Sequence, residues 1–214
     1  MQPIWSNPLI MNTKPSADPR VEIVNQETAY QGHFRIEAYS LRHRTHEGGW
    51  TPELRFELFE RGRTAVVLPY DPVLDQVVLI EQFRIGAYAS GGEPWLAEAV
   101  AGRIEPGELA EDAVRREAME EAGCAVNELH SIGAFLLTPG ACSEACTMFA
   151  GRVDASDVGG VHGVAEEGED IRVIATPAEE AIARAMNGGI TSTYGAIPLL
   201  WLAANRDMLR AKWA

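Results

Sequence analysis

Between Gly102 and Cys124 the chain reads GRIEPGELAEDAVRREAMEEAGC, and this segment constrains the fold more than any other. Residues 110–122 are good helix formers without glycine or proline, which predicts a helix with Gly123 just past its end. Residues three and four apart share a helix face, so Glu117, Glu120 and Glu121 project as one carboxylate cluster. The apolar positions expected to form the opposite, buried face are Ala110, Ala113, Val114, Ala118 and Met119.

This carboxylate cluster has two explanations. Acidic helix faces are usually just solvated, and the segment EAMEEA alone favours that reading. Its surroundings favour a site, because Glu108 lies where the helix begins and Arg116 can hold Glu108 or a neighbour in a bidentate pair. A divalent cation removes the repulsion between clustered carboxylates, and hard oxygen ligands suit Mg²⁺, with Mn²⁺ as a substitute. The sequence therefore predicts a metal site for phosphate chemistry.

The segment resembles the Nudix box, the signature of a family that hydrolyses nucleoside diphosphates linked to a further group. The matching residues are Gly102, Glu108, Arg116, Glu117, Glu120, Glu121 and Gly123. Other segments resemble the ADP-ribose pyrophosphatases of that family: FERG (59–62), LPYDPVLDQVVLIEQFRIGAY (68–88), EAVAG (98–102), AEEGEDIRV (165–173) and NRDMLRAKWA (205–214). Pro139 lies fifteen residues past the box, and a proline at this position is characteristic of the ADP-ribose hydrolases within the family. The resemblance implies Mg²⁺-dependent hydrolysis of ADP-ribose to AMP and ribose 5-phosphate.

The resemblance also implies roles for single residues around the metal. Ala101 would offer its backbone carbonyl to a metal ion, and Glu117, Glu121 and Glu169 would be carboxylate ligands. Glu120 would support them or share a second ion. Glu167 would act as the general base, with Glu166 as the alternative, on a glycine-flanked loop that can close over substrate.

A second set of implied roles concerns the substrate. Glu98 would hydrogen-bond it, Arg84 would contact phosphate or the terminal ribose, and Arg61 would join the substrate site. An aromatic side chain and an arginine sandwich the base in related bacterial proteins, and the aligned residues here are His33 and Phe56. Both rings can stack on a purine. These two residues have an equally simple reading as ordinary strand positions.

Alternating apolar residues predict the strands. VEIV, HFRIEAYSLRHR and ELRFELFE indicate a small antiparallel sheet in residues 21–62, after an arm of residues 1–20. TAVVLPY and QVVLIEQFR flank a turn at Asp71-Pro72 and predict a hairpin, and WLAEAVA predicts one strand that runs into Gly102. SIGAFLL, CTMFAGRV and IRVIA are further strands, followed by helices at 177–186 and 193–213. Residues 63–214 are thus expected to form an α+β domain, an α/β/α sandwich with the Nudix fold.

The composition argues against nucleic acids and membranes as partners of this protein. A net charge of −13 disfavours nucleic-acid binding, and bound cations would let an acidic protein accept a phosphate substrate. The start of the chain lacks a signal-peptide pattern, and AIPLLWLAA, the longest apolar run, is too short to span a bilayer. A cytoplasmic protein without membrane contact is expected. The resemblance implies a homodimer formed through the small N-terminal sheet.

Two rival functions stay open. One is hydrolysis of another nucleoside diphosphate sugar, such as GDP-mannose or ADP-glucose, because the hydrolytic core would be the same. The other is a nucleotide-sugar sensor without catalysis. Sensors of this kind commonly lose box carboxylates and add a DNA-binding segment, whereas this chain keeps Glu117, Glu120 and Glu121 and is strongly acidic.

Overall fold

The computed structural model describes residues 17–164, 166 and 168–213. By its internal contacts the chain divides into two compact units. The first contains the chain up to Arg63 together with Ala134–Cys146, and the second contains Thr64–Gly133 and the chain from Thr147 onward. Each unit is described by itself below.

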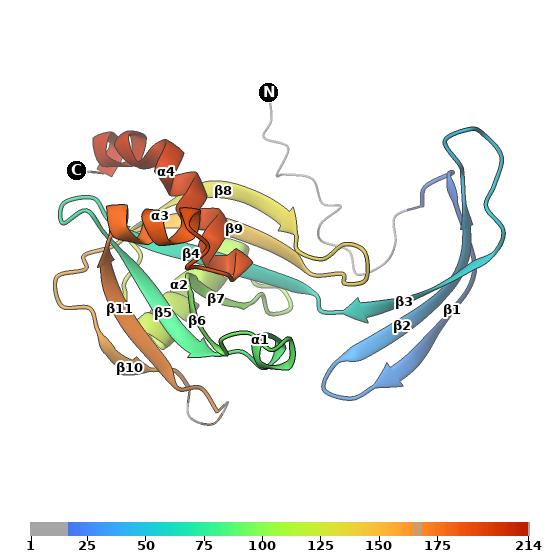
Figure 1. The fold of residues 1–214 in the computed structure, drawn as a ribbon, viewed down its shortest axis with the longest axis horizontal. Helices are drawn as coiled ribbons and strands as arrows, with labels where there is room; N and C mark the ends of the chain where they lie inside the picture. Colours follow the sequence, from blue (N-terminus) through green and yellow to red (C-terminus); the bar gives the residue numbers. More distant parts are fainter. Residues whose placement is uncertain (1–16, 165, 167, 214) are drawn as a thin grey trace. The chain divides into compact units, whose positions relative to one another are not determined.

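The first unit is built on a three-stranded antiparallel sheet in the order β1-β2-β3 (Figure 1). Its strands are β1 (Val21–Gln31), β2 (Arg35–His43) and β3 (Leu54–Glu60). β1 is longer than the predicted VEIV because it stays paired with β2 as far as Gln31↔Arg35, across two register shifts. All eleven residues of β1 are exposed.

The main sheet begins with a hairpin that opens. β4 (Arg63–Asp71) and β5 (Gln76–Phe83) pair with each other only next to their turn, through Tyr70↔Val77 and Asp71↔Gln76. Beyond that point two further strands take over the hydrogen bonds: β6 (Trp95–Glu98) pairs with β5, and β7 (Val100–Arg103) pairs with β4.

The prediction of one strand for WLAEAVA, residues 95–101, was therefore wrong. The segment is interrupted at Ala99, where it leaves β5 and joins β4. Each half satisfies the backbone groups that the opened hairpin leaves without a partner, which stabilises two short strands over one long one. The exchange places Glu98 on β6 and Ala101 on β7, two strands with different partners.

The remaining strands complete the sheet, whose order in the described residues is β10-β11-β5-β4-β9-β8. They are β8 (Glu128–Leu136), β9 (Ala145–Arg152), β10 (Gly160–His162) and β11 (Ile171–Pro177). β10 and the short helix α1 (Ile85–Ala89) were not predicted, because three and five residues are too few for a periodic pattern.

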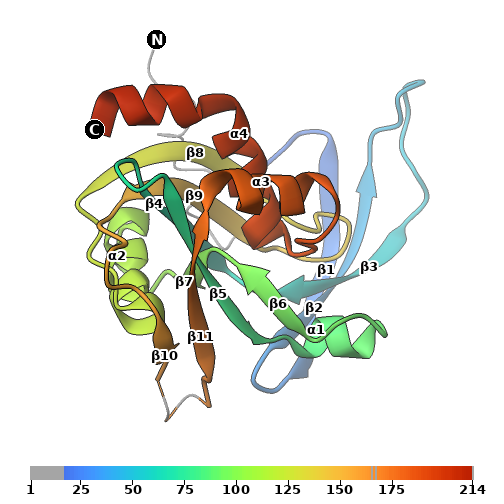
Figure 2. The ribbon, with the colours of Figure 1, turned by 60° about the vertical axis from the view of Figure 1, so that its left-hand side comes forward.

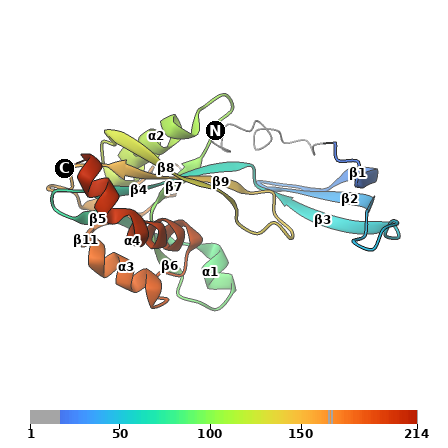
Figure 3. The ribbon, with the colours of Figure 1, turned by 90° about the horizontal axis from the view of Figure 1, so that it is seen from above.

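Helices cover both faces of this sheet. α2 (Ala110–Ala122) lies on one face, and α3 (Ala178–Met186) and α4 (Thr193–Trp213) lie on the other (Figure 2 and Figure 3). Figure 3 shows the sheet nearly edge-on between the two helical layers. The predicted α+β class and α/β/α sandwich are confirmed, and the predicted bounds of α2 and α4 match.

The core between α2 and the sheet corrects one detail of the predicted helix face. Ala113, Val114 and Ala118 are fully buried as expected, but Met119 is 53% exposed and Glu121 is only 3% exposed. Successive helix residues are turned by about 100°, so a face that runs through 114, 118 and 121 leaves 119 at the surface. A carboxylate, not a methionine, therefore points into the protein.

Asp71 gives a test of what holds the main sheet together. This buried carboxylate accepts hydrogen bonds from the backbone N–H groups of Val73 and Leu74 at 2.8 and 2.9 Å and of Ala155 at 2.9 Å. Asp71→Ala would leave three donors without an acceptor, so we expect it to lower the free energy of unfolding by about 3 kcal/mol in urea denaturation. The control Asp154→Ala, at an exposed carboxylate that bonds Ser156, should stay close to wild type. Equal effects of the two variants would contradict this role.

Candidate active site

The loop before α2 is held to the helix by one glutamate and one arginine. The Glu108 carboxylate accepts a bond from the Glu105 N–H at 2.9 Å and from Arg116 Nε at 3.1 Å. Gly107 allows the turn between them because its φ of 87° lies in the left-handed region. Gly123 ends the helix in the same conformation, with a φ of 62°. Both ends of α2 are thus set by residues that the box specifies.

Arg116 joins most of the box carboxylates. Besides Glu108, its guanidinium donates to Glu117 at 2.7 Å, to Glu120 at 3.1 Å and to the Arg103 carbonyl at 3.2 Å. The bonds to Glu108, more than any other cause, raise the pKa of Arg116. The arginine therefore supplies the positive charge that lets Glu117 and Glu120 on the helix lie close to Glu108 on the preceding loop.

Gly102 makes room for the Glu117 carboxylate. A Cβ at this position of β7 would lie 1.7 Å from Glu117 Oε1, which is an impossible contact. The glycine is needed here for space rather than for an unusual backbone conformation. It allows α2 to approach β7 so closely that Glu117 lies against the strand.

Glu121 is the most perturbed carboxylate of the site. Its Oε2 accepts a hydrogen bond from the Ala101 N–H at 3.0 Å. Burial raises the pKa of Glu121 to about 8, and the nearby carboxylates of Glu117 and Glu169 act in the same direction, while Arg84 opposes them. The sequence placed this residue opposite the expected buried face of the helix, and that was wrong, because α2 turns Glu121 toward β7. A buried carboxylate among other carboxylates fits a site for a cation.

The loop between β10 and β11 reaches the same place. The Gly163 N–H donates to the Glu120 carbonyl at 3.2 Å, and the Glu169 carboxylate accepts the Val164 N–H at 2.9 Å. Glu169 is near enough to raise the pKa values of both Glu117 and Glu121. Glu167, the expected general base, lies outside the described residues, whereas its alternative Glu166 is exposed.

Arg84 and Glu98, which were both expected to contact the substrate, form an ion pair with each other. Arg84 Nε donates to Glu98 Oε2 at 2.7 Å, and Glu98 is 3% exposed. Gln82 lies on β5, two residues before Arg84, which directly follows the strand in extended conformation. Gln82 is also buried, and its Nε2 has no partner among the described residues. Sequence reasoning missed Gln82, although an alternating strand pattern puts it on the same face as Arg84.

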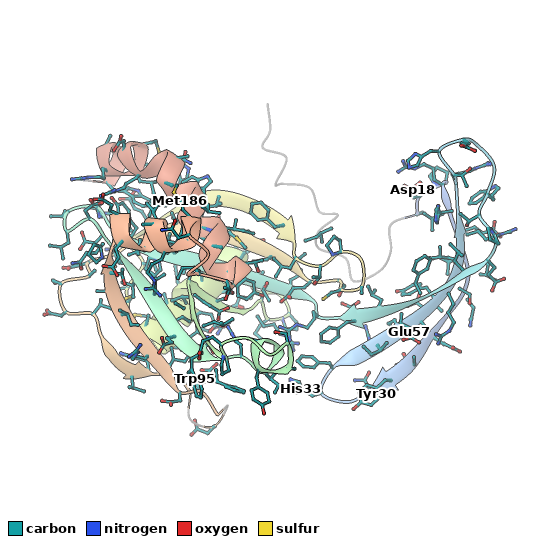
Figure 4. All side chains as sticks on the ribbon, viewed as in Figure 1. Asp18, Tyr30, His33, Glu57, Trp95 and Met186 are labelled. Atoms are coloured by element: carbon teal, nitrogen blue, oxygen red, sulfur yellow. The ribbon has the colours of Figure 1, made fainter. Side chains whose placement is uncertain are left out.

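His33, Phe56 and Arg61 all belong to the first unit. His33 lies at the β1–β2 turn (Figure 4), with its ring 4.5 Å from that of Phe34. Phe56 is an exposed residue of β3. Arg61 lies over the rings of Phe34 and Phe59, at 4.9 and 5.8 Å from their centroids. The remaining expected site residues, apart from Glu167, lie in the second unit. There Ala101, Arg84, Glu117 and Glu169 all act on the pKa of Glu121.

The carboxylates expected to bind a metal ion are hydrogen-bonded to other groups of the same chain. Within the described part of the chain, no three histidine, cysteine, aspartate or glutamate side chains are grouped so as to hold a metal ion as they stand. Glu117 and Glu120 bond to Arg116, and Glu169 bonds to a backbone N–H. The type of donor nevertheless suits a hard divalent cation, because every candidate ligand is an oxygen.

Comparison with known proteins gives a consistent picture. A model of the NUDIX domain matches residues 60–188. The ADP-ribose pyrophosphatase of Escherichia coli K12 is 47% identical over 194 residues, covering 91% of this chain and 93% of the relative. The corresponding protein of Haemophilus influenzae is 38% identical over 196 residues, covering 90% of each.

More distant relatives include a GDP-mannose pyrophosphatase of Pectobacterium atrosepticum, which is 33% identical over 175 residues, covering 79% of this chain and 87% of the relative. Among solved structures, one described as the crystal structure of an ADP compounds hydrolase superposes with a TM-score of 0.65. It covers 93% of this chain and 99% of that chain at 19% identity, and so supports the fold.

The contact between Gly102 and Glu117 can be tested directly. In Gly102→Ala the new methyl group must displace the Glu117 carboxylate, so we expect Mn²⁺ affinity to fall about tenfold or more in electron paramagnetic resonance titrations. The matched control is Gly140→Ala, where an added Cβ meets no atom within 4 Å. Unchanged Mn²⁺ affinity in Gly102→Ala would exclude Glu117 from the metal site.

The raised pKa of Glu121 predicts how stability depends on pH in the presence of a chelator. An ordinary glutamate has a pKa of 4.5, whereas that of Glu121 is about 8 in the folded protein. Between these values the folded protein keeps a proton that the unfolded chain releases, so stability falls as pH rises through this window. Glu121→Gln has no such proton, and we expect a flatter decline in urea denaturation between about pH 5 and 8. The control Glu120→Gln should keep the wild-type dependence of stability on pH. If Glu121→Gln keeps it as well, Glu121 does not titrate in this range and the prediction is wrong.

Proposed function

This chain belongs to the Nudix family of hydrolases, and from that premise we propose that it hydrolyses the pyrophosphate bond of ADP-ribose to AMP and ribose 5-phosphate. The observation that carries the proposal is a likeness over nearly the whole chain, 47% identity, to an ADP-ribose pyrophosphatase. The chain keeps Glu117, Glu120 and Glu121, and Arg84 is near enough to Glu121 to act on its pKa, which supports a catalytic protein over a nucleotide-sugar sensor.

We place the metal at the junction of β7 and α2. Glu117, Glu121, Glu169 and the Ala101 carbonyl would hold Mg²⁺, with Glu120 in support and Mn²⁺ as a substitute. A bound divalent ion supplies positive charge to the diphosphate oxygens and lowers the pKa of bound water. Since Glu117 and Glu120 bond to Arg116, the protein's own step on metal binding would be to turn Glu117 away from that arginine.

Two other groups of the chain would accept the proton of the attacking water and bind the phosphate. Glu167 would accept the proton of the attacking water, a role typically worth about 10² to 10⁴ in rate. Support for this placement comes from the loop itself, because Glu169 on the same loop is close to the box glutamates. The Arg84 guanidinium would bind phosphate by charge-assisted hydrogen bonds.

The first unit would bind the base and form the dimer. We assign residues 21–62 to dimerisation and His33, Phe56 and Arg61 to the substrate's nucleoside. Support for an interface comes from β1, an exposed edge strand with apolar side chains such as Tyr30, which is 62% exposed (Figure 4). None of the described helices has the length and apolar character needed to span a membrane. The cytoplasmic location stays a prediction.

The second candidate is a hydrolase of GDP-mannose, and the 33% identical GDP-mannose pyrophosphatase supports it. The metal site would serve either substrate. Selection between them would rest with the base and sugar contacts, where His33 and Phe56 replace the aromatic–arginine pair of related proteins.

A substrate panel tests the proposed function. ADP-ribose, ADP-glucose and GDP-mannose would be compared by kcat/KM with Mg²⁺, and the products of ADP-ribose analysed after reaction in heavy-oxygen water. We expect ADP-ribose to be preferred over GDP-mannose by about tenfold or more, because a site that hydrogen-bonds one base leaves polar groups unpaired with another. A preference for GDP-mannose would overturn the proposal, and tight binding of ADP-ribose without turnover would revive the sensor.

A further inference from the structure

Glu98 uses both of its carboxylate oxygens inside the protein. Oε2 accepts the bond from Arg84 Nε at 2.7 Å, and Oε1 accepts a bond from the hydroxyl of Ser192. The side chain lies on β6 and is almost completely buried. Glu98 is therefore poorly placed to touch a substrate, in contrast to what the resemblance implies for it.

Ser192 immediately precedes α4 and is fixed by that helix. Its hydroxyl accepts the Tyr194 N–H at 3.3 Å, and its carbonyl accepts the N–H groups of Gly195 and Ala196 at 3.2 and 2.8 Å. Such a residue caps a helix N-terminus. Here the same hydroxyl both accepts from the helix and donates to Glu98, which links α4 to β6.

The beginning of α4 lies directly against β6. A Cβ on Gly195 would be 3.0 Å from the Ala97 carbonyl oxygen and 3.3 Å from Glu98 Cα. Only a residue without a side chain permits this approach without a shift of the neighbouring backbone. The distance between Ser192 and Glu98 is thus set by packing of the helix on the strand.

The contact between Ser192 and Glu98 holds the carboxylate that binds Arg84. Arg84 bonds to Glu98 through Nε, not the two terminal nitrogens, and about a third of its side chain is exposed. It is also near enough to Glu121 to influence the box carboxylate. A guanidinium held through Nε keeps its terminal N–H groups in one plane, as bidentate recognition of phosphate requires.

We infer that Ser192 and Glu98 are positioning residues that hold the Arg84 guanidinium in place for the diphosphate of the substrate. The inference rests on the proposed function, since it takes a nucleoside diphosphate sugar as the ligand. Glu98 acts through Arg84 rather than by contact with the substrate. Helix α4, which is far from the box in the sequence, thereby takes part in substrate binding.

The test compares Ser192→Ala with Ser192→Thr by steady-state kinetics on ADP-ribose with Mg²⁺. Arg84 would bind the phosphates equally in the ground state and the transition state, so loss of its support raises KM and leaves kcat nearly unchanged. We expect a three- to tenfold rise in KM, roughly the effect of one hydrogen bond to a charged group. Ser192→Thr keeps the hydroxyl and should restore KM.

Two controls separate positioning from helix capping. Thr193→Ala, at the exposed neighbouring hydroxyl, should leave KM unchanged. Ser192→Ala in an Arg84→Ala background should cause no further rise in KM, because the two residues act through one contact. If Ser192 only caps α4, Ser192→Ala lowers the melting temperature but leaves KM at the wild-type value, and the inference fails.

A readout without substrate distinguishes this failure from failure of the proposed function. The ¹⁵N resonance of the Arg84 Nε–H should shift in Ser192→Ala and stay in place in Thr193→Ala. A wild-type protein that does not turn over ADP-ribose would overturn the proposed function alone. An unchanged Arg84 signal in Ser192→Ala would overturn the positioning role, whatever the substrate is.

Discussion

The close approach of α2 to β7 is the constraint on which the site depends. It is possible because Gly102 has no side chain, so that the Glu117 carboxylate occupies the space a Cβ would need. The same approach buries Glu121 and brings it to the Ala101 N–H. One missing methyl group thus decides where the Glu117 carboxylate lies.

Charge balance within the second unit follows from this packing. The chain carries a net charge of −13, and its box glutamates would repel one another if they were left unpaired. Arg116 compensates Glu108, Glu117 and Glu120, and the charge of Arg84 opposes the rise in the pKa of Glu121. Glu121 itself has no arginine bonded to it in the described structure, which is why burial dominates its pKa.

The strand exchange at Ala99 connects the proposed metal site with the proposed substrate site. Because the chain leaves β5 and joins β4 at this point, Glu98 and Ala101 lie three residues apart but on different strands. Glu98 then turns toward Arg84 and Ser192, while Ala101 faces Glu121. An uninterrupted strand would have kept both residues in one pairing and left the opened hairpin without partners.

The sequence by itself determined the local features. Good helix formers followed by Gly123 predicted α2 at its observed bounds, and the spacing of the box residues predicted which carboxylates gather, because both depend on neighbours within a few turns. It could not show that Met119 is exposed and Glu121 buried, that residues 95–101 divide between two strands, or that Ser192 reaches Glu98 across 94 positions. Only the tertiary structure decided these, since they depend on how closely distant segments pack, and periodicity along the chain carries no information about that distance.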